Sequence, residues 1–176
     1  MTGGSSRTRI LANTIYDNVT AGINVEGGST DATVANNISV ENGLDSPRTH
    51  SNIRVDAASV PGTSLDYDLV YLDGGEHLLI WKSVGYRSLA AFRAATGQER
   101  HGLEADPKWR NRAAGNFHLA TRSPAIDSAS SRVRSQPGID INGTRRTDDP
   151  ATLNTGVGPR QYDDRGAFEF HSASGR

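Results

Sequence analysis

The sequence contains no cysteine, which excludes both a disulfide framework and a thiolate metal site. Lysine is scarce, because Lys82 and Lys108 are the only two among 19 basic residues, and the formal net charge is −1. A chain so close to neutral has no charge signature of a nucleic-acid partner. Hydrophobic residues amount to 35%, and no apolar run approaches the length needed to cross a membrane. We therefore expect no nucleic acid and no membrane among its partners.

Short alternating segments with polar turns between them make up residues 10–81. Overlaying residues 12–15 on residues 35–38 gives a repeat of about 23 residues, and overlaying 22–26 on 52–56 gives one of about 30. The first spacing fits one coil of a solenoid, and the second fits a coil that carries a loop. We predict an all-β right-handed parallel β-helix of about three coils over residues 1–87.

Alternation along each short strand predicts which side chains face the core. The expected inward residues are Ile23, Val25, Ile53, Val55, Leu78 and Ile80, and the expected outward residues are Asn24, Glu26, Arg54, Asp56, His77, Leu79 and Trp81. Asn13, Asn36 and Asn37 fall where strands turn, where asparagine tolerates left-handed backbone and can stack in ladders.

One helix is expected within residues 88–105, together with a polar linker. Ser88 is a suitable N-cap, Leu89, Phe92 and Ala95 form an apolar stripe, and Gly97 supplies the left-handed residue that ends a helix. We expect this helix to close the side or the end of the coils.

From residue 106 to residue 176 the chain consists of short motifs joined by Gly, Pro, Ser and Arg, with strands expected at 117–119 and 167–170. The motifs are Asp106-Pro-Lys-Trp, Gly115-Asn-Phe-His-Leu, Ser123-Pro-Ala-Ile-Asp, Asp140-Ile-Asn-Gly-Thr-Arg-Arg and Gly166-Ala-Phe-Glu. In this order they resemble the C-terminal end of secreted bacterial right-handed β-helix proteins of the pectate-lyase-like superfamily. The resemblance implies an irregular cap over residues 106–176, a secreted, extracellular protein and a polysaccharide partner.

The amino terminus departs from that superfamily. Its members carry many coils before the cap, and here a strand pattern begins within about ten residues of Met1 with no helix to cover the first coil. The basic and apolar regions of a signal peptide are also absent from this chain. We expect that upstream coils belong to a longer parent protein, or that self-association or another chain covers the open end.

Two reactions on a polysaccharide are compatible with the outward residues. Coil stacking would place Glu26 and Asp56 ~4.8 Å apart, as a general acid–base pair for glycoside hydrolysis. Arg54 would bind an acidic sugar, with Asn24 beside it and Trp81 as a sugar platform. The alternative is that both acids form solvated ion pairs with Arg54, and that Trp81 packs under the helix.

Elimination by a polysaccharide lyase is the second reaction. Lys82 would be the base, Arg54 would neutralise the uronate carboxyl, and Asp66 and Asp68 could hold Ca²⁺, although both look equally like turn residues. His77 is the only histidine beside the expected groove, and the five histidines lack metal-ligand spacing, so no protein metal site is predicted.

The resemblance, together with the acid and arginine pairs on one face, therefore predicts a carbohydrate-active protein that acts by elimination or hydrolysis. The alternative is a non-catalytic cap, glycan-binding or structural module. A third class, an adhesin or phage-tail fragment, would form an intertwined oligomer.

Overall fold

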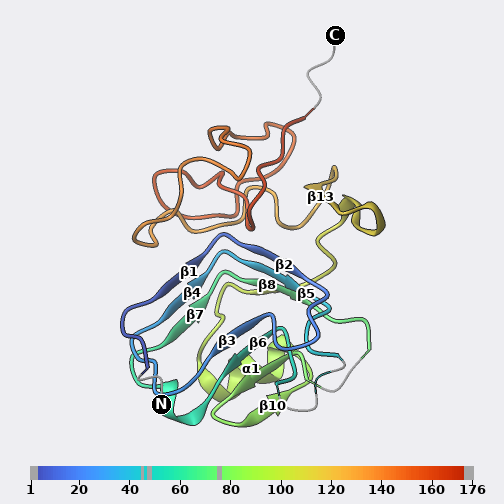
Figure 1. The fold of residues 1–176 in the computed structure, drawn as a ribbon. Helices are drawn as coiled ribbons and strands as arrows, with labels where there is room; N and C mark the ends of the chain where they lie inside the picture. The colour runs from blue at the N-terminus through green and yellow to red at the C-terminus, as the bar shows by residue number, and fades with distance from the viewer. Residues whose placement is uncertain (1–3, 45, 47–48, 75–76, 173–176) are drawn as a thin grey trace.

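The computed structural model describes residues 4–44, 46, 49–74 and 77–172 of the chain (Figure 1). Its regular elements are short strands with a single α-helix, which confirms the all-β class. In chain order the strands are β1 Arg9–Leu11, β2 Thr14–Tyr16, β3 Ile23–Val25, β4 Thr33–Ala35, β5 Ile38–Val40, β6 Ile53–Val55, β7 Ser64–Asp66, β8 Leu69–Tyr71, β9 Leu79–Trp81, β10 Val84–Tyr86, β11 Leu103–Glu104, β12 Trp109–Asn111 and β13 Asn116–Leu119. The helices are the 3₁₀ turns η1 Ala57–Ser59 and η2 Arg112–Ala114, and α1 Leu89–Thr96.

Three sheets with parallel pairing hold the first half of the chain (Figure 1). Their strand orders are β1-β4-β7, β2-β5-β8-β11 and β3-β6-β9, the last extended by an antiparallel β10. From β1 to β9 the chain visits the three sheets in the same order three times. Strands whose paired residues are 24 to 34 positions apart in sequence thus become hydrogen-bonded neighbours, from Thr14 opposite Ile38 to Leu69 opposite Leu103.

The structure confirms one of the two predicted repeat spacings and corrects the other. The 30-residue overlay is confirmed, because Ile23, Asn24 and Val25 pair with Ile53, Arg54 and Val55. The 23-residue overlay is wrong by one position, because Thr14 rather than Ile15 lies opposite Ile38. Every side chain changes face when the register slips by one, so the single residue matters.

A residue with left-handed backbone conformation at each corner accounts for the observed register. Ala12, Asn36 and Tyr67 occupy the same corner position with φ of 53°, 59° and 64°. The residue after each one then forms the ladder, so Asn13 stacks on Asn37 and not on Asn36. Sequence similarity between Asn13 and Asn36 therefore gave the wrong alignment.

The ladder at this corner begins with an exposed and a buried asparagine and ends with two buried acids. The Asn13 and Asn37 amides each donate to the next side chain, with Asn13 Nδ2 2.9 Å from Asn37 Oδ1 and Asn37 Nδ2 2.8 Å from Asp68 Oδ1. The backbone N–H of Asp68 donates to Glu99 Oε2 at 3.2 Å. The predicted asparagine ladder is therefore present, and it continues into carboxylates.

Helix α1 packs against the apolar core enclosed by the sheets. Ser88 accepts the N–H of Ala91, and Gly97 is left-handed at φ 71°, as predicted. Phe92 is fully buried, with its ring centroid 6.2 Å from that of Trp81 and 5.3 Å from that of Tyr86. Ala95 is exposed, so the predicted third member of the apolar stripe was wrong.

The side chains of β9 face the opposite way from the prediction. Leu79 and Trp81 are buried opposite Ile53 and Val55, and Ile80 is partly exposed opposite Arg54. The predicted inward Ile80 and outward Leu79 and Trp81 were therefore wrong. Four apolar residues in succession hide the alternation, so the register is decided by the neighbouring strand.

The C-terminal segment, residues 106–172, covers the outside of the sheet β2-β5-β8-β11, and Figure 1 draws it in yellow, orange and red above the strands. A second apolar cluster joins the two parts: Ile38, Val40, Leu69, Leu119, Ala125, Ile126 and Phe170. Asn36 links its corner of the strands to the C-terminal segment, because its side-chain amide is hydrogen-bonded to both the N–H and the carbonyl of Ser130. The strand predicted at 117–119 is confirmed as part of β13, whereas residues 167–170 are not a strand.

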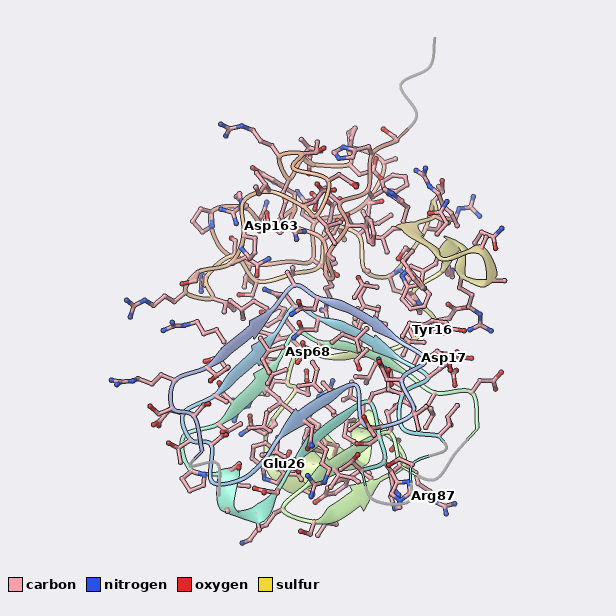
Figure 2. All side chains as sticks on the ribbon, viewed as in Figure 1. Tyr16, Asp17, Glu26, Asp68, Arg87 and Asp163 are labelled. Carbon is pink, nitrogen blue, oxygen red and sulfur yellow. The ribbon has the colours of Figure 1, made fainter. Side chains whose placement is uncertain are left out.

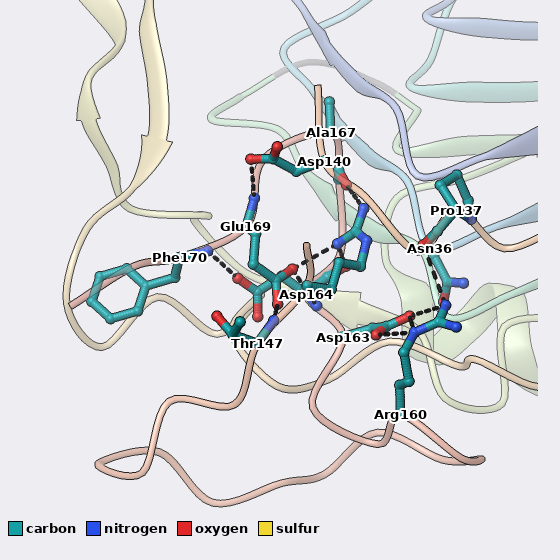
Figure 3. A network of polar contacts seen from close by, with 12 residues as sticks. Asn36, Pro137, Asp140, Thr147, Arg160, Asp163, Asp164, Ala167, Glu169 and Phe170 are labelled. Carbon is teal, nitrogen blue, oxygen red and sulfur yellow. Dashed lines mark hydrogen bonds and ion pairs between the residues drawn. The ribbon is translucent and has the colours of Figure 1, made fainter. Parts of the chain in front are cut away.

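Side-chain contacts take the place of a strand at residues 167–170 (Figure 3). Arg146 Nη1 lies 2.8 Å from Glu169 Oε2, and both side chains are almost completely buried. Asp164 accepts the backbone N–H groups of Asp127 and Phe170. The fold of this segment therefore depends on buried charged groups, each placed by a specific partner. In the described part of the chain, no helix is long and apolar enough to cross a membrane.

Candidate functional site

The outward face of the sheet β3-β6-β9 carries the predicted binding residues. Asn24, Arg54 and Ile80 lie in one row. Arg54 Nη1 donates to Asn24 Oδ1 at 2.8 Å and to Glu26 Oε2 at 3.1 Å. Figure 2 labels Glu26 on the side of the molecule away from the C-terminal segment. The predicted grouping of Asn24, Arg54 and Glu26 is thus present, and the charges of Arg54 and Glu26 already compensate each other.

The carboxylate of Asp56 is hydrogen-bonded to backbone N–H groups. Its carboxylate caps η1 by accepting Ser59 N–H at 2.8 Å, and it also accepts Gly27 N–H at 3.0 Å. Partial burial favours the protonated acid, but these donors and the charge of Arg54 outweigh it and hold the pKa of Asp56 below its usual value. A carboxyl with a lowered pKa and two backbone donors is poorly suited to act as a general acid.

The predicted base lies at the same corner as these acids. Lys82 follows β9 as Asp56 follows β6 and Glu26 follows β3, and its N–H donates to the carbonyl of Val55 at 3.0 Å. Its side chain is exposed. The structure therefore brings Glu26, Asp56 and Lys82 to one edge.

Two of the predicted substrate-binding residues lie elsewhere. Trp81 is buried against Phe92, so it offers no outward platform for a sugar. His77 precedes β9 and lines a cavity of about 160 Å³ with His50, whose ring centroid is 6.5 Å away. Neither side chain joins the cluster around Arg54.

A groove that the sequence did not indicate runs along the sheet β1-β4-β7, where the C-terminal segment meets it. Its volume is about 250 Å³, and its polar lining comprises Thr33, Ser64, Asp66, Tyr67, Ser130 and Arg132. The guanidinium of Arg132 is exposed and forms no hydrogen bond or ion pair with the rest of the described chain. The groove therefore offers a cation whose charge is not already compensated by a bonded acid.

Asp66, which lines the groove, pairs with a histidine that is not part of the lining. His101 Nδ1 lies 2.9 Å from Asp66 Oδ2, and Asp66 Oδ1 accepts the N–H of His101 at 2.8 Å. The Tyr67 ring stacks on the His101 ring with centroids 4.5 Å apart. Burial and the charge of Asp66 raise the pKa of Tyr67, and Arg165 and Arg132 offset part of the rise. An imidazole fixed in this way leaves its other nitrogen available for proton transfer.

Sequence reasoning could not find this arrangement, because its members come from three distant segments. Asp66 was considered only as a turn residue or a Ca²⁺ ligand with Asp68. The structure separates their carboxylates: Asp66 binds His101, and Asp68 is buried and binds Asn37. In the described residues, no three His, Cys, Asp or Glu side chains are grouped as a metal site.

No protein-family model matches the chain. An uncharacterized protein of Bacillus subtilis (strain 168), YwoF, is 28% identical over 126 residues. The match covers 70% of this chain and 26% of that protein, so the chain spans about a quarter of the length of the curated relative that it matches.

Proposed function

We propose that this chain is a right-handed parallel β-helix of the pectate-lyase-like kind that acts on an extracellular, acidic polysaccharide. Support for the fold comes from the three sheets visited in constant order and from the stacked Asn13, Asn37 and Asp68 at one corner. Each visit to the sheets buries one layer of side chains on the next, which is how a solenoid builds its core.

The observation that carries the proposed activity is the groove that Arg132 shares with Asp66, whose carboxylate binds His101. A volume of about 250 Å³ is smaller than the ~300–1,000 Å³ typical of drug-sized ligand sites, so it suits one sugar unit of a longer chain. A guanidinium matches a carboxylate in bidentate fashion. Arg132 would therefore select a uronate.

Elimination is the reaction that these groups suit best. Pairing with Arg132 withdraws charge from the uronate carboxylate and makes the neighbouring C–H more acidic. His101 takes that proton, and the electron pair of the C–H bond forms a carbon–carbon double bond. The glycosidic C–O bond breaks, and its oxygen takes a proton from water. Asp66 fixes the orientation of the imidazole through its contact with Nδ1.

An activity assay with matched variants tests the proposal. The chain is incubated with acidic and neutral polysaccharides, with and without Ca²⁺, while ultraviolet absorbance of unsaturated products and new reducing ends are both followed. We expect absorbance with an acidic polymer, a loss on the order of 10²-fold or more in H101A and R132A, and full activity in R134A. Arg134 is an exposed arginine of the same segment. New reducing ends without absorbance, lost in E26Q, would move the activity to the corner at Glu26 and contradict elimination.

A non-catalytic glycan-binding module is the second candidate. It is favoured by the state of the predicted catalytic corner, where Asp56 caps η1 and Glu26 neutralises Arg54. Such a module would bind the polysaccharide without turnover, and R132A would weaken binding. Measurement of binding alongside turnover therefore separates the two candidates.

A further inference from the structure

Asp127, in the Ser123-Pro-Ala-Ile-Asp motif, is a buried acid without a partner for its charge. Its side chain is fully buried, and neither carboxyl oxygen accepts a well-aligned hydrogen bond, although the backbone N–H of Asp149 interacts with the carboxyl group. Its backbone, in contrast, is fixed: the N–H donates to Asp164 Oδ1 at 2.7 Å, and the carbonyl accepts Thr155 N–H at 2.8 Å. The carboxyl group is therefore held in place by the fold and left unsatisfied there.

Other buried acids of the same segment differ from Asp127 in this respect. Asp163 binds the guanidinium of Arg160, Glu169 binds that of Arg146, and Asp140 accepts the N–H groups of Asn142 and Thr144. An uncompensated buried carboxylate is costly, so such a group is neutralised by a proton or by a bound cation.

A second buried oxygen without a donor lies on the segment that is hydrogen-bonded to the Asp127 backbone. Asn154 immediately precedes Thr155, which is bonded to the Asp127 carbonyl, and the side-chain Oδ1 of Asn154 is also buried without a donor. The negative charges of Asp148 and Asp149 act on Asp127 as well. Two orphaned side-chain oxygen groups thus project from two backbone segments that are hydrogen-bonded to each other.

We propose that Asp127 and Asn154 provide ligands for a hard divalent cation, Ca²⁺, which ties residues 123–127 to residues 148–156. Carboxylate and amide oxygens are the ligands that Ca²⁺ takes in proteins, and flexible coordination lets backbone carbonyls and water complete the shell. Because the described chain groups no three acidic or histidine side chains around one point, a dissociation constant on the order of 10⁻⁴–10⁻³ M is expected, as in extracellular modules. This site lies outside the groove and does not depend on the proposed elimination.

A proton is the competing occupant. Burial, with contributions from Asp148 and Asp149, raises the pKa of Asp127 to about 7, and the backbone N–H of Asp149 offsets part of the rise. Cation binding competes with that proton, so the Ca²⁺ effect must grow from about pH 6 to about pH 8.

Thermal unfolding of the whole chain at about pH 8, titrated with CaCl₂ after treatment with a chelator, tests the site. With Ca²⁺ at about ten times the dissociation constant, the melting temperature is expected to rise by about 3–6 °C. D127N and N154A must each lose most of this rise, whereas D17N, at an exposed acid, and D66N, in the groove, must keep it.

Terbium luminescence gives a second readout that is independent of unfolding. Tb³⁺ should bind the wild type and be displaced by Ca²⁺, and D127N should not show this displaceable signal. An unchanged melting temperature of the wild type in Ca²⁺ would overturn the site, as would a Ca²⁺ shift that D127N and N154A retain. If D127N does not fold, N154A, which removes only a neutral ligand, decides the outcome.

Discussion

Replacing Asp68 by Asn should stabilise the protein at neutral pH. In the corner ladder, Asn13 and Asn37 each donate an amide N–H to the next side chain, but Asp68 is followed by Glu99, a second acid. Both acids are fully buried, and Asp68 Oδ2 and Glu99 Oε1 have no donor. Figure 2 labels Asp68 below the C-terminal segment, where Arg165 binds its carbonyl. An asparagine at position 68 would extend the donor pattern by one step.

The size and sign of the effect follow from the pKa of Asp68. Burial is the main cause that raises it from 3.8 to about 6, and burial with the charge of Asp68 raises that of Glu99 well above its ordinary value. An acid whose pKa is raised in the folded state costs nothing below about pH 4, and its full cost applies above about pH 6. At about 1.4 kcal/mol for each pKa unit, the cost of ionised Asp68 is about 3 kcal/mol. D68N removes it.

Urea denaturation, followed by tryptophan fluorescence at about pH 4 and about pH 8, measures this difference. D68N should be up to about 3 kcal/mol more stable than the wild type at the higher pH and nearly equal at the lower pH. D17N, at an exposed acid, should change stability by less than about 0.5 kcal/mol at both. A D68N protein that is less stable at about pH 8, or shifted equally at both pH values, would refute the reasoning.

Three further substitutions test the packing. F92A should cost about 3–5 kcal/mol in urea denaturation, because Phe92 is fully buried between Trp81 and Tyr86, and a loss below about 1 kcal/mol would contradict that packing. R146M should cost about 3–5 kcal/mol by leaving Glu169 buried and unpaired, and adding E169Q should restore part of the loss. G166A should destabilise more than G143A: both positions have positive φ, but only at Gly166 would the new methyl group lie 2.7 Å from Ile38 Cδ1, so equal losses would count against the docking of residues 165–167.

Local patterns in the sequence were sufficient for the class of the fold and for α1. The alternation of Ile23 and Val25 with Asn24 is decided within one strand, and the caps Ser88 and Gly97 are decided within one helix. The 30-residue register was also accessible, because both strands repeat the same alternation.

Features decided by a neighbouring strand or a distant segment were not accessible. In β9 the order of Leu79, Ile80 and Trp81 carries no alternation, and only pairing with β6 turns Trp81 into the core. The one-residue error between Asn36 and Asn37 has the same origin, because the backbone conformation of the corner, not its amino acid, fixes the register.

The candidate site depends even more than the strands on contacts between segments that are distant in the sequence. The carboxylate of Asp66 meets His101, 35 positions later, and Arg132 reaches the groove only because the C-terminal segment docks at the corner of Asn36. Asp56 looked like a catalytic acid because its outward position was visible in the sequence, whereas its bonds to Gly27 and Ser59 were not.

Hydrogen exchange in the presence of an acidic oligosaccharide tests the proposed polysaccharide groove most directly. It compares two faces of one molecule, so the face around Arg54 serves as the internal control. We predict slower exchange in β4, β7 and residues 130–133, with little change in β3 and β6, and loss of the effect in R132A. Protection confined to β3 and β6, or no protection by any acidic polymer, would contradict the groove as the site of polysaccharide binding.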